Sequence, residues 1–440
     1  MRRTIAVTAA LAVALFGAVA CGSDEPAPPA ANPLDGTGKT LKVWLMVDAE
    51  SAWPGVVEQT NAKFKEVTKA DVKVEYQQWA NHLTKLDATL AGSDVPDVIE
   101  LGNTEAAKYV FSGAFADISG KKSSFENSDT WLTGLSAPCE ADGKLYCAPY
   151  YAGARVLIYR TDLFQANGIS PPKTYDELLA AADKLQAAGS AKNPKFQAFY
   201  MPGKFWYAAM AWVYGSGGQI AKKEGDKWVG TLSEQASQDG LTKWADLAKK
   251  YSKGDPTKDE NDQAAIFSQG QTAMMLGNGW EIGATESQPS NPNDPKSPKK
   301  DTVVKGKVAG LPMPGFTADK GMPSFLGGSI VGVTNKSANQ ALATEWTRIF
   351  TATAQQEALL AKGALPNATA LLDKAAQVKG NESTAIAAKN SWFTPNAPKW
   401  ADVEKANVLQ QMLVDIVTGK KSVADATKAA DEQIAATLNG

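Results

Sequence analysis

The pattern of apolar and polar positions beyond residue 38 alternates between two periods. Runs with strand-like period or continuous apolar character alternate with segments in which apolar residues recur every three or four positions. The strands are expected at Leu41–Val47, Val72–Trp79 and Pro96–Leu101, and the helices at Pro54–Lys69 and Asn81–Ala91. The order β-α-β-α-β predicts an α/β fold with a mainly parallel sheet covered by helices.

The remaining chain continues the same mixture. Thr174 followed by Glu177 predicts a capping box at the start of a helix that continues through Leu178–Ala188. Further strands are expected at Arg155–Tyr159 and Gly328–Thr334, and further helices at Asp162–Asn167, Trp206–Tyr214, Ser233–Tyr251, Asp259–Ser268, Asn339–Thr353, Val403–Thr418 and Val423–Leu438.

Polar and aromatic residues follow the first three predicted strands directly. Asp48, Trp79 and the stretch Gly102-Asn103-Thr104 occupy these positions. In open α/β sheets, ligands bind beyond the carboxyl ends of parallel strands. We therefore expect a binding site at this edge.

The first 38 residues differ in character from the rest. Arg2 and Arg3 precede an apolar run, Ile5–Ala20, and Cys21 follows it. The pattern resembles a bacterial lipoprotein signal, residues 1–20, cleaved before a lipid-bearing Cys21; the alternative is a plain secretory signal. Residues 21–38, rich in Pro and Ala, predict a disordered tether. No later segment is apolar enough to cross a membrane.

Two cysteines remain after Cys21, and an exported chain favours a disulfide between them. Cys139 and Cys147 flank Asp142-Gly143, which is typical turn chemistry, and a hairpin with a three-residue loop would bring the cysteines opposite one another. Two free buried thiols are the alternative.

Composition limits the chemistry that the chain can perform. At 440 residues it is long enough for two or three domains, and a net charge of -2 disfavours nucleic acid as a partner. The single histidine, His82, is expected to be an ordinary polar helix residue, so a histidine metal site or a Ser-His-Asp triad is not expected. No phosphate-binding glycine motif is present, and no cofactor is expected.

Aromatic residues gather in polar, glycine- and proline-rich segments. Their flat faces suit the apolar face of a sugar ring, and neighbouring carboxylates and amides suit its hydroxyls. Candidates are Tyr151, Trp206, Trp280, Trp392 and Trp400, with packing in the core as the alternative. Core positions are expected for four tryptophans inside strands or helices: Trp44, Trp212, Trp244 and Trp346.

The segment MMLGNGWEIGA, residues 274–284, combines most of these signals. Met274–Leu276 predicts a buried strand, and Gly277 and Gly279 are expected to allow a sharp turn and the close approach of a ligand. Trp280 would stack on a sugar, and Glu281 would accept from a hydroxyl. A glycoside hydrolase that uses Asp48, Glu105 or Glu281 as its acid groups is the alternative from these residues alone.

Motifs along nearly the whole mature chain resemble the sugar-binding lipoproteins of bacterial ABC importers, the superfamily that includes maltose-binding protein. The motifs are Leu41–Asp48, Pro96–Glu105 with Ser112–Ile118, Gly143–Pro149 with Leu157–Phe164, Ala273–Trp280, Gly310–Pro314 and Phe325–Ser329. The resemblance implies the two-lobed type II periplasmic-binding-protein fold, with a mainly parallel sheet flanked by helices in each lobe and the ligand cleft between them. It implies lobe I at 39–153 and 313–365, lobe II at 154–312 and 366–440, and chain crossings near Gly153, Gly310–Pro312 and Gly363–Pro366.

The resemblance also assigns site residues. Asp48 matches the acid after the first strand, Asn103, Thr104 and Glu105 the polar second loop, and Trp280 a stacking tryptophan, while Trp392 and Trp400 flank a loop similar to one that carries another. The ligand-binding set is Asp48, Asn103, Thr104, Glu105, Tyr151, Arg155, Trp206, Trp280, Glu281, Gly328, Trp392 and Trp400.

One departure concerns the ligand. Maltose binders have an acid in the crossing strand, where this chain has Ala152-Gly153-Ala154, so the resemblance favours other di- and oligosaccharides, including chito-oligosaccharides. The expected function is that of a non-enzymatic, monomeric receptor, anchored by Cys21 outside the cytoplasmic membrane. It delivers an oligosaccharide to the permease subunits of an ABC importer. A glycan-binding surface sensor is a further alternative.

Overall fold

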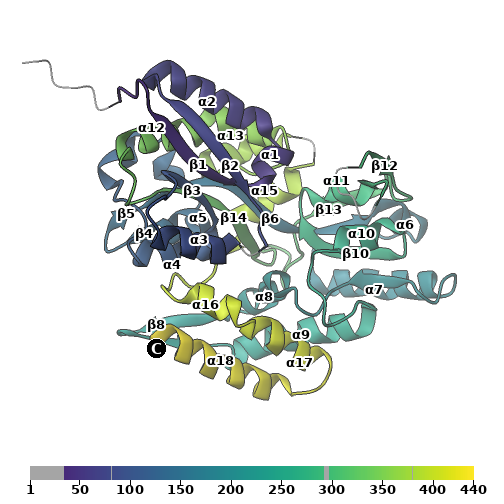
Figure 1. The fold of residues 1–440 in the computed structure, drawn as a ribbon. Helices are drawn as coiled ribbons and strands as arrows, with labels where there is room; N and C mark the ends of the chain where they lie inside the picture. Colours follow the sequence, from purple (N-terminus) through teal and green to yellow (C-terminus); the bar gives the residue numbers. More distant parts are fainter. Residues whose placement is uncertain (1–33, 81, 292–296, 379) are drawn as a thin grey trace, which may run out of the picture. The chain divides into compact units, whose positions relative to one another are not determined.

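In the computed structural model, two long strands, β6 and β14, run through the middle of the fold (Figure 1). The structure describes residues 34–80, 82–291, 297–378 and 380–440. The predicted signal segment and Cys21 lie outside these residues. Of the predicted tether, residues 34–38 are described, and there Gly36 is buried and donates its N–H to Thr68 O at 2.7 Å.

The main sheet has nine strands, and its neighbours follow the order β2-β1-β3-β14-β6-β10-β7, with β13 beside β6 and β15 beside β14. Pairing is parallel among β2, β1 and β3, between β10 and β7, and between β14 and β15. It is antiparallel between β14 and β3, between β14 and β6, and between β6 and both β10 and β13. The strands are β1 (Thr40–Met46), β2 (Asp71–Gln77), β3 (Val98–Gly102), β6 (Cys147–Arg160), β7 (Gln197–Tyr200), β10 (Thr272–Asn278), β13 (Val308–Leu311), β14 (Ser324–Val333) and β15 (Ser391–Trp392). Small hairpins are formed by β4 (Glu140–Ala141) with β5 (Lys144–Leu145), β8 (Ala221–Glu224) with β9 (Lys227–Gly230), and β11 (Ser287–Pro289) with β12 (Lys299–Asp301).

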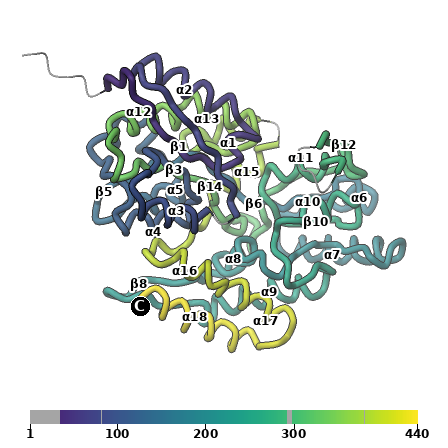
Figure 2. Tube along the Cα trace, viewed as in Figure 1, coloured from purple at the N-terminus to yellow at the C-terminus, as the bar shows by residue number. Residues whose placement is uncertain are grey.

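Helices cover this sheet, as the α/β prediction requires. They are α1 (Val47–Ser51), α2 (Pro54–Thr68), α3 (His82–Ala91), α4 (Asn103–Phe111), α5 (Thr133–Ser136), α6 (Thr161–Ala166), α7 (Tyr175–Ser190), α8 (Trp206–Gly215), α9 (Gln235–Tyr251), α10 (Gln263–Ser268), α11 (Glu281–Glu286), α12 (Gln340–Phe350), α13 (Thr353–Leu360), α14 (Leu372–Ala376), α15 (Glu382–Lys389), α16 (Trp400–Lys405), α17 (Val408–Val417) and α18 (Val423–Asn439). Helix α2 packs on α12 and α13, and α9 packs on α8, α17 and α18 (Figure 2).

Strand β6 changes its sheet neighbours halfway along its length. Its first half, Cys147–Ala154, pairs with β14, and its second half, Arg155–Arg160, pairs with β10 and β13. Separate apolar cores pack against the two halves. Trp44 and Trp346 lie in the core beside the first half of β6. Trp212 and Trp244 lie in the core beside its second half. The prediction that these four tryptophans are buried is therefore confirmed.

The predicted disulfide between Cys139 and Cys147 is present. The loop between the cysteines is shorter than predicted, because Glu140 pairs with Leu145 and Ala141 with Lys144. This leaves a two-residue turn, Asp142-Gly143, in which both residues have positive φ (50° and 74°), as a type I′ hairpin turn requires.

Two helix predictions need correction. Thr174 caps α7 by accepting from Glu177 N at 3.2 Å, but the Glu177 carboxylate accepts from Lys173 N at 2.7 Å instead of closing the box on Thr174. The single helix predicted over Val403–Thr418 is two helices, α16 and α17. Asn407 separates them because it adopts a left-handed conformation, with φ of 54°.

Candidate ligand-binding site

A cleft of about 280 Å³ lies where β6 changes partners, beside the carboxyl ends of β1, β3 and β10. This is the edge at which the sequence predicts a site. Eight of the twelve predicted site residues line it: Asp48, Asn103, Thr104, Glu105, Tyr151, Arg155, Trp280 and Gly328. Six residues outside that prediction complete the lining: Trp79, Gly102, Tyr207, Asn278, Phe325 and Gly327.

One wall of the cleft is acidic. Asp48 lies in the first turn of α1, and its Oδ2 accepts from the Trp79 indole at 2.6 Å. Glu105 lies in the first turn of α4, and its Oε2 accepts from Gly102 N at 3.1 Å. Among the residues that the structure describes, neither Asp48 Oδ1 nor Glu105 Oε1 accepts a hydrogen bond. Both oxygens are therefore available to ligand hydroxyls.

The neighbouring residues of α4 are already engaged by the protein. The Asn103 amide donates to Gly134 O and to Leu326 O, both at 2.9 Å. Thr104 Oγ1 donates to Glu404 Oε2 at 3.3 Å, which connects α4 to α16. Asn103 thus joins α4 to α5 and β14, and its amide nitrogen stabilises the fold.

Arg155 packs against a pair of adjacent aromatic rings at the point where β6 changes partners. Its guanidinium carbon is 4.8 Å from the centre of the Tyr207 ring and 4.7 Å from that of Phe325. A Cβ at Gly327 would approach Arg155 Nη1 to 2.8 Å, so the glycine makes room for the cation. Arg155 Nε is buried without a hydrogen-bond partner in the described part of the chain, and burial lowers the pKa of the group. The N–H groups of the guanidinium are therefore suited to a hydrogen-bond acceptor supplied by a ligand.

Trp280 forms a second aromatic surface of the cleft. It precedes α11, and 48% of its surface is exposed, far more than is usual for a tryptophan. Its six-membered ring covers Gly153 of β6 so closely that a Cβ there would lie 2.5 Å from Trp280 Cζ3. Beside it, Asn278 Oδ1 is buried and has no partner among the described residues.

The role expected of Gly277 and Gly279 is only partly correct. The chain turns at Gly279, but neither glycine has a positive φ, and Gly277 belongs to β10. A Cβ at Gly277 would lie 3.0 Å from Glu281 Oε1, and one at Gly279 would lie 2.5 Å from Thr384 Cγ2. The two glycines therefore make room for side chains of the protein itself.

Glu281 does not line the cleft. Its Oε1 accepts from Asn278 N at 2.8 Å and its Oε2 accepts from Gln263 at 2.7 Å, while burial raises its pKa. The carboxylate thus ties the start of α11 to the end of β10 and to α10. In this position it fixes the backbone beneath Trp280.

Three predicted aromatic residues belong to the core. Trp206, Trp392 and Trp400 are each at most 3% exposed, and Trp206 lies 6.2 Å and 6.1 Å from the other two, measured between ring centres. Helices α8 and α16 turn Trp206 and Trp400 inward, and strand β15 carries Trp392. The adjacent Tyr207 lines the cleft in place of Trp206, since consecutive helix residues face different directions.

Gly328 and Tyr151 define the base of the site. Gly328 has a φ of 143°, and a Cβ there would lie 2.0 Å from Tyr151 O, so only glycine fits. Tyr151 packs edge-on against Trp53 at 5.2 Å, and burial raises its pKa well above the ordinary value.

Residues outside the predicted ligand-binding set had weak signals. Trp79 ends a predicted strand at the edge where the sequence predicts a site, so its place was predicted although it was not assigned to the ligand. Asn278 and Phe325 reach Arg155 through the pairing of β6, β10 and β14, and Tyr207 reaches it from α8. The sequence shows neither arrangement.

Within the described residues, no group of three or more His, Cys, Asp or Glu side chains is placed to hold a metal ion. None of the helices there combines the length and apolar content needed to cross a bilayer.

Sequence comparison identifies the family. The profile described as "Bacterial extracellular solute-binding protein" matches residues 44–357. The chain belongs to this family. Among its relatives is the diacetylchitobiose binding protein DasA of Streptomyces coelicolor, 34% identical over 97% of both chains.

Solved structures share the fold of this solute-binding protein. The GacH receptor of Streptomyces glaucescens, solved without ligand and with acarbose, aligns with a TM-score of 0.75 at 20% identity, covering 91% of this chain and 98% of that one. A solute-binding protein of Thermotoga lettingae bound to alpha-D-tagatose aligns with a TM-score of 0.73 at 21% identity, covering 91% and 100%. These alignments confirm the predicted type II periplasmic-binding-protein fold. The residue division into two lobes stays a prediction.

Proposed function

We propose that this protein is the sugar receptor of an ABC importer and that its cleft captures an N-acetylated di- or oligosaccharide of the chitobiose type. The observation that carries the proposal is the composition of the cleft. Exposed tryptophans border it, and unengaged hydrogen-bonding groups of both kinds line it. The relationship to a diacetylchitobiose binding protein supports the N-acetylated class.

The aromatic surfaces suit a pyranose ring. Trp280 and Trp79 are 48% and 37% exposed, so each can cover the apolar face of a sugar unit. Burial of the flat C–H face removes water from both surfaces, and the stacking fixes the orientation of the ring.

The polar groups suit what such a ligand carries. Asp48 Oδ1 and Glu105 Oε1 can each accept from a ring hydroxyl. Arg155 can donate to an acetamido carbonyl, and Asn278 Oδ1 can accept the acetamido N–H. An acetamido group of the ligand therefore meets Arg155 and Asn278, and its hydroxyls meet the acidic wall.

A receptor fits this cleft better than a hydrolase does. Glu281, one of the three candidate acids, has both oxygens engaged by the protein. Asp48 is oriented by Trp79 and Glu105 by Gly102, which suits two fixed hydrogen-bond acceptors. Incubation with chito-oligosaccharides followed by mass spectrometry is expected to return them intact, and shortened products would overturn this assignment.

Localisation and assembly complete the proposal. The protein is a monomer held at the outer face of the cytoplasmic membrane by a lipid on Cys21, and it passes its ligand to a permease. The family description supports an extracellular site. Labelling cells with a radioactive or clickable palmitate should tag the wild-type protein and leave Cys21→Ala untagged and released into the medium. Equal tagging of both would contradict the anchor.

Calorimetry with a panel of saccharides tests the central claim. Diacetylchitobiose and its longer homologues are expected to bind, with maltose and cellobiose as matched controls that lack the acetamido group. A ligand present at one hundred times its Kd should stabilise the protein by about 2.7 kcal/mol. Binding to amino acids or polyamines, and to no saccharide, would refute the sugar assignment.

A further inference from the structure

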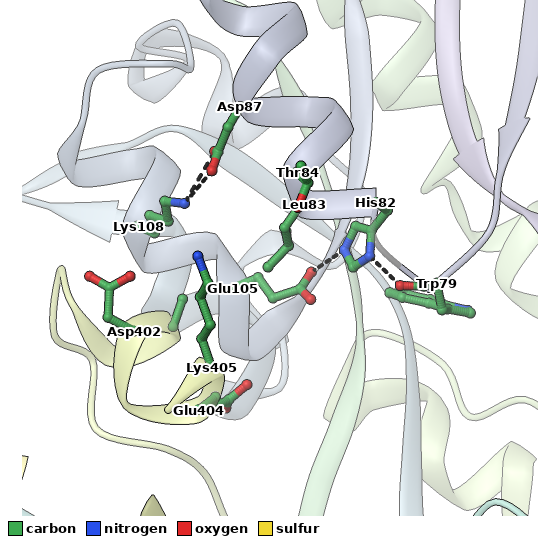
Figure 3. A pocket seen from close by; sticks show the side chains of 11 residues that line it. Trp79, His82, Leu83, Thr84, Asp87, Glu105, Lys108, Asp402, Glu404 and Lys405 are labelled. Atoms are coloured by element: carbon green, nitrogen blue, oxygen red, sulfur yellow. Dashed lines mark hydrogen bonds and ion pairs between the residues drawn. The ribbon is translucent and has the colours of Figure 1, made fainter. Parts of the chain in front are cut away.

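His82, the one histidine in the sequence, lies directly behind the acidic wall of the cleft. It begins α3, and Figure 3 shows its ring between Glu105 on one side and the backbone of Trp79 on the other. The Nδ1 atom is 2.6 Å from Trp79 O, and the Nε2 atom is 2.9 Å from Glu105 Oε2. Only 8% of the His82 side chain and 14% of the Glu105 side chain are exposed.

The partners of the ring define its protonation. A backbone carbonyl can only accept a hydrogen bond, so Nδ1 carries a proton and donates to Trp79 O. A hydrogen bond between Nε2 and Glu105 Oε2 needs one proton between the two atoms. An imidazole is a stronger base than a carboxylate, so we place this proton on Nε2 and assign the doubly protonated imidazolium.

Both partners of this imidazolium also line the ligand cleft. Trp79 is held at two places, since its carbonyl accepts from His82 and its indole donates to Asp48 Oδ2. The rings of Trp79 and His82 meet edge to face, with centres 5.4 Å apart. Glu105 is held through Oε2, which leaves Oε1 for a ligand. One ring therefore fixes an aromatic wall and a hydroxyl acceptor together.

We propose that His82 is a positioning residue of the sugar site, and that the affinity for ligand depends on the proton shared within the His82–Glu105 pair. The inference rests on the proposed function. His82 does not line the cleft, so it acts through Trp79 and Glu105. A neutral ring can donate a hydrogen bond to only one of these two partners. Loss of the proton therefore removes a hydrogen bond that holds one wall of the site in place.

The pH dependence has a definite sign. Burial lowers the pKa of His82, but the hydrogen bond and the charge of Glu105 outweigh it and leave the pKa above its ordinary value. The proton is thus present at low pH and lost as pH rises through that raised pKa, and affinity should fall in the same interval.

Two other buried acids titrate nearby, so the test must separate them. Burial raises the pKa of Glu100, on β3, to about 7 and that of Glu404, on α16, to about 8. The charged groups around the ring and its two partners are Asp48 on α1, Asp87 on α3, Glu100 on β3, Glu105 and Lys108 on α4, and Asp402, Glu404 and Lys405 on α16.

Nuclear magnetic resonance can follow the ring directly, because a protein made without added histidines gives a single imidazole signal. We expect that signal in the free protein to titrate above 6.5, the ordinary histidine value, and to show protons on both nitrogens below its pKa. Saturation with diacetylchitobiose should raise the pKa further, because binding and protonation favour each other by the same factor. A pKa at or below the ordinary value, or one that the ligand leaves unchanged, would overturn the proposal.

Variants supply the second readout, the Kd for diacetylchitobiose between pH 6 and 9. His82→Gln keeps one donor of the two and should bind about three- to tenfold more weakly at low pH, the loss of one hydrogen bond, with little dependence on pH. Thr84→Ala, an exposed change on the same helix that does not line the cleft, is the matched control and should follow wild type. Glu404→Gln should retain the slope of wild type.

The outcomes separate the two claims. If the dependence of Kd on pH disappears in Glu404→Gln and persists in His82→Gln, the role of His82 is contradicted. If no saccharide binds at any pH, the proposed function fails, and the titration of the free protein still decides whether the imidazolium is present.

Discussion

Replacement of Trp280 by alanine should weaken sugar binding at least tenfold. A tryptophan side chain presents about 250 Å² of surface, and 48% of Trp280 is exposed. About 120 Å² is therefore open, and a sugar ring that covers half of it removes about 60 Å² of aromatic surface from water. At about 25 cal/mol per Å², this contributes about 1.5 kcal/mol, which is slightly more than a factor of ten in Kd.

The same substitution also removes the part of the ring that packs on Gly153. The buried part of Trp280 as a whole is about 130 Å², and it contributes up to about 3 kcal/mol to the free energy of unfolding. The variant is therefore expected to melt earlier than wild type and still unfold cooperatively. Kd should be measured by calorimetry well below the melting temperature found by circular dichroism.

Two further variants serve as comparisons for the affinity of Trp280→Ala. Trp280→Phe retains a flat, smaller ring and should lose only part of the affinity. Val303→Ala alters a side chain that is 63% exposed and does not line the cleft, and it should bind like wild type. A Kd for Trp280→Ala within twofold of wild type, in a folded protein, would show that Trp280 does not stack on the ligand.

Three further predictions follow from contacts already described. Gly153→Ala places a Cβ about 2.5 Å from Trp280 Cζ3, so the ring must move, and calorimetry should show a several-fold loss of sugar affinity; unchanged affinity would mean that the ring position is not important. Reduction of Cys139–Cys147, or the double serine variant, should cost about 2–3 kcal/mol of stability in a urea titration and leave the Kd unchanged, because this short loop lies outside the cleft. The pKa of Glu404 is raised by burial to about 8, so the folded state holds a proton that the unfolded state releases above about 4.5. Stability of the wild type should therefore fall between about pH 5 and pH 8, and Glu404→Gln should show a smaller fall; identical curves would contradict the burial of this acid.

The fold was predictable largely because its signals are local. The alternation of β1, α2, β2, α3 and β3 follows directly from apolar periodicity, and the cap at Thr174 follows from its side chain. The break at Asn407 was not predictable, because the apolar pattern continues across it and only the left-handed backbone ends α16.

The same distinction between local signals and long-range packing applies to the candidate site. Residues at the carboxyl ends of strands, such as Asp48 and Thr104, reach the cleft as predicted. For residues whose position depends on packing between distant segments, the composition of the surrounding sequence led to the wrong prediction. Trp206 and Trp400 meet each other in the core, although their polar neighbours resemble those of Trp280, because helix phase and not composition determines the direction of each ring.

Strand β6 belongs to both halves of the sheet, and this has a consequence for dividing the protein. Any cut that separates the part paired with β14 from the part paired with β10 leaves one fragment without its neighbouring strand and with unpaired backbone groups. Independent expression of either half should therefore give insoluble material. Insertion of a reporter, by contrast, is best tolerated at surface turns such as Gly225 in the β8–β9 hairpin, which lies outside both the shared strand and the lining of the cleft. A sugar biosensor built on this scaffold should keep β6 whole and carry its reporter there.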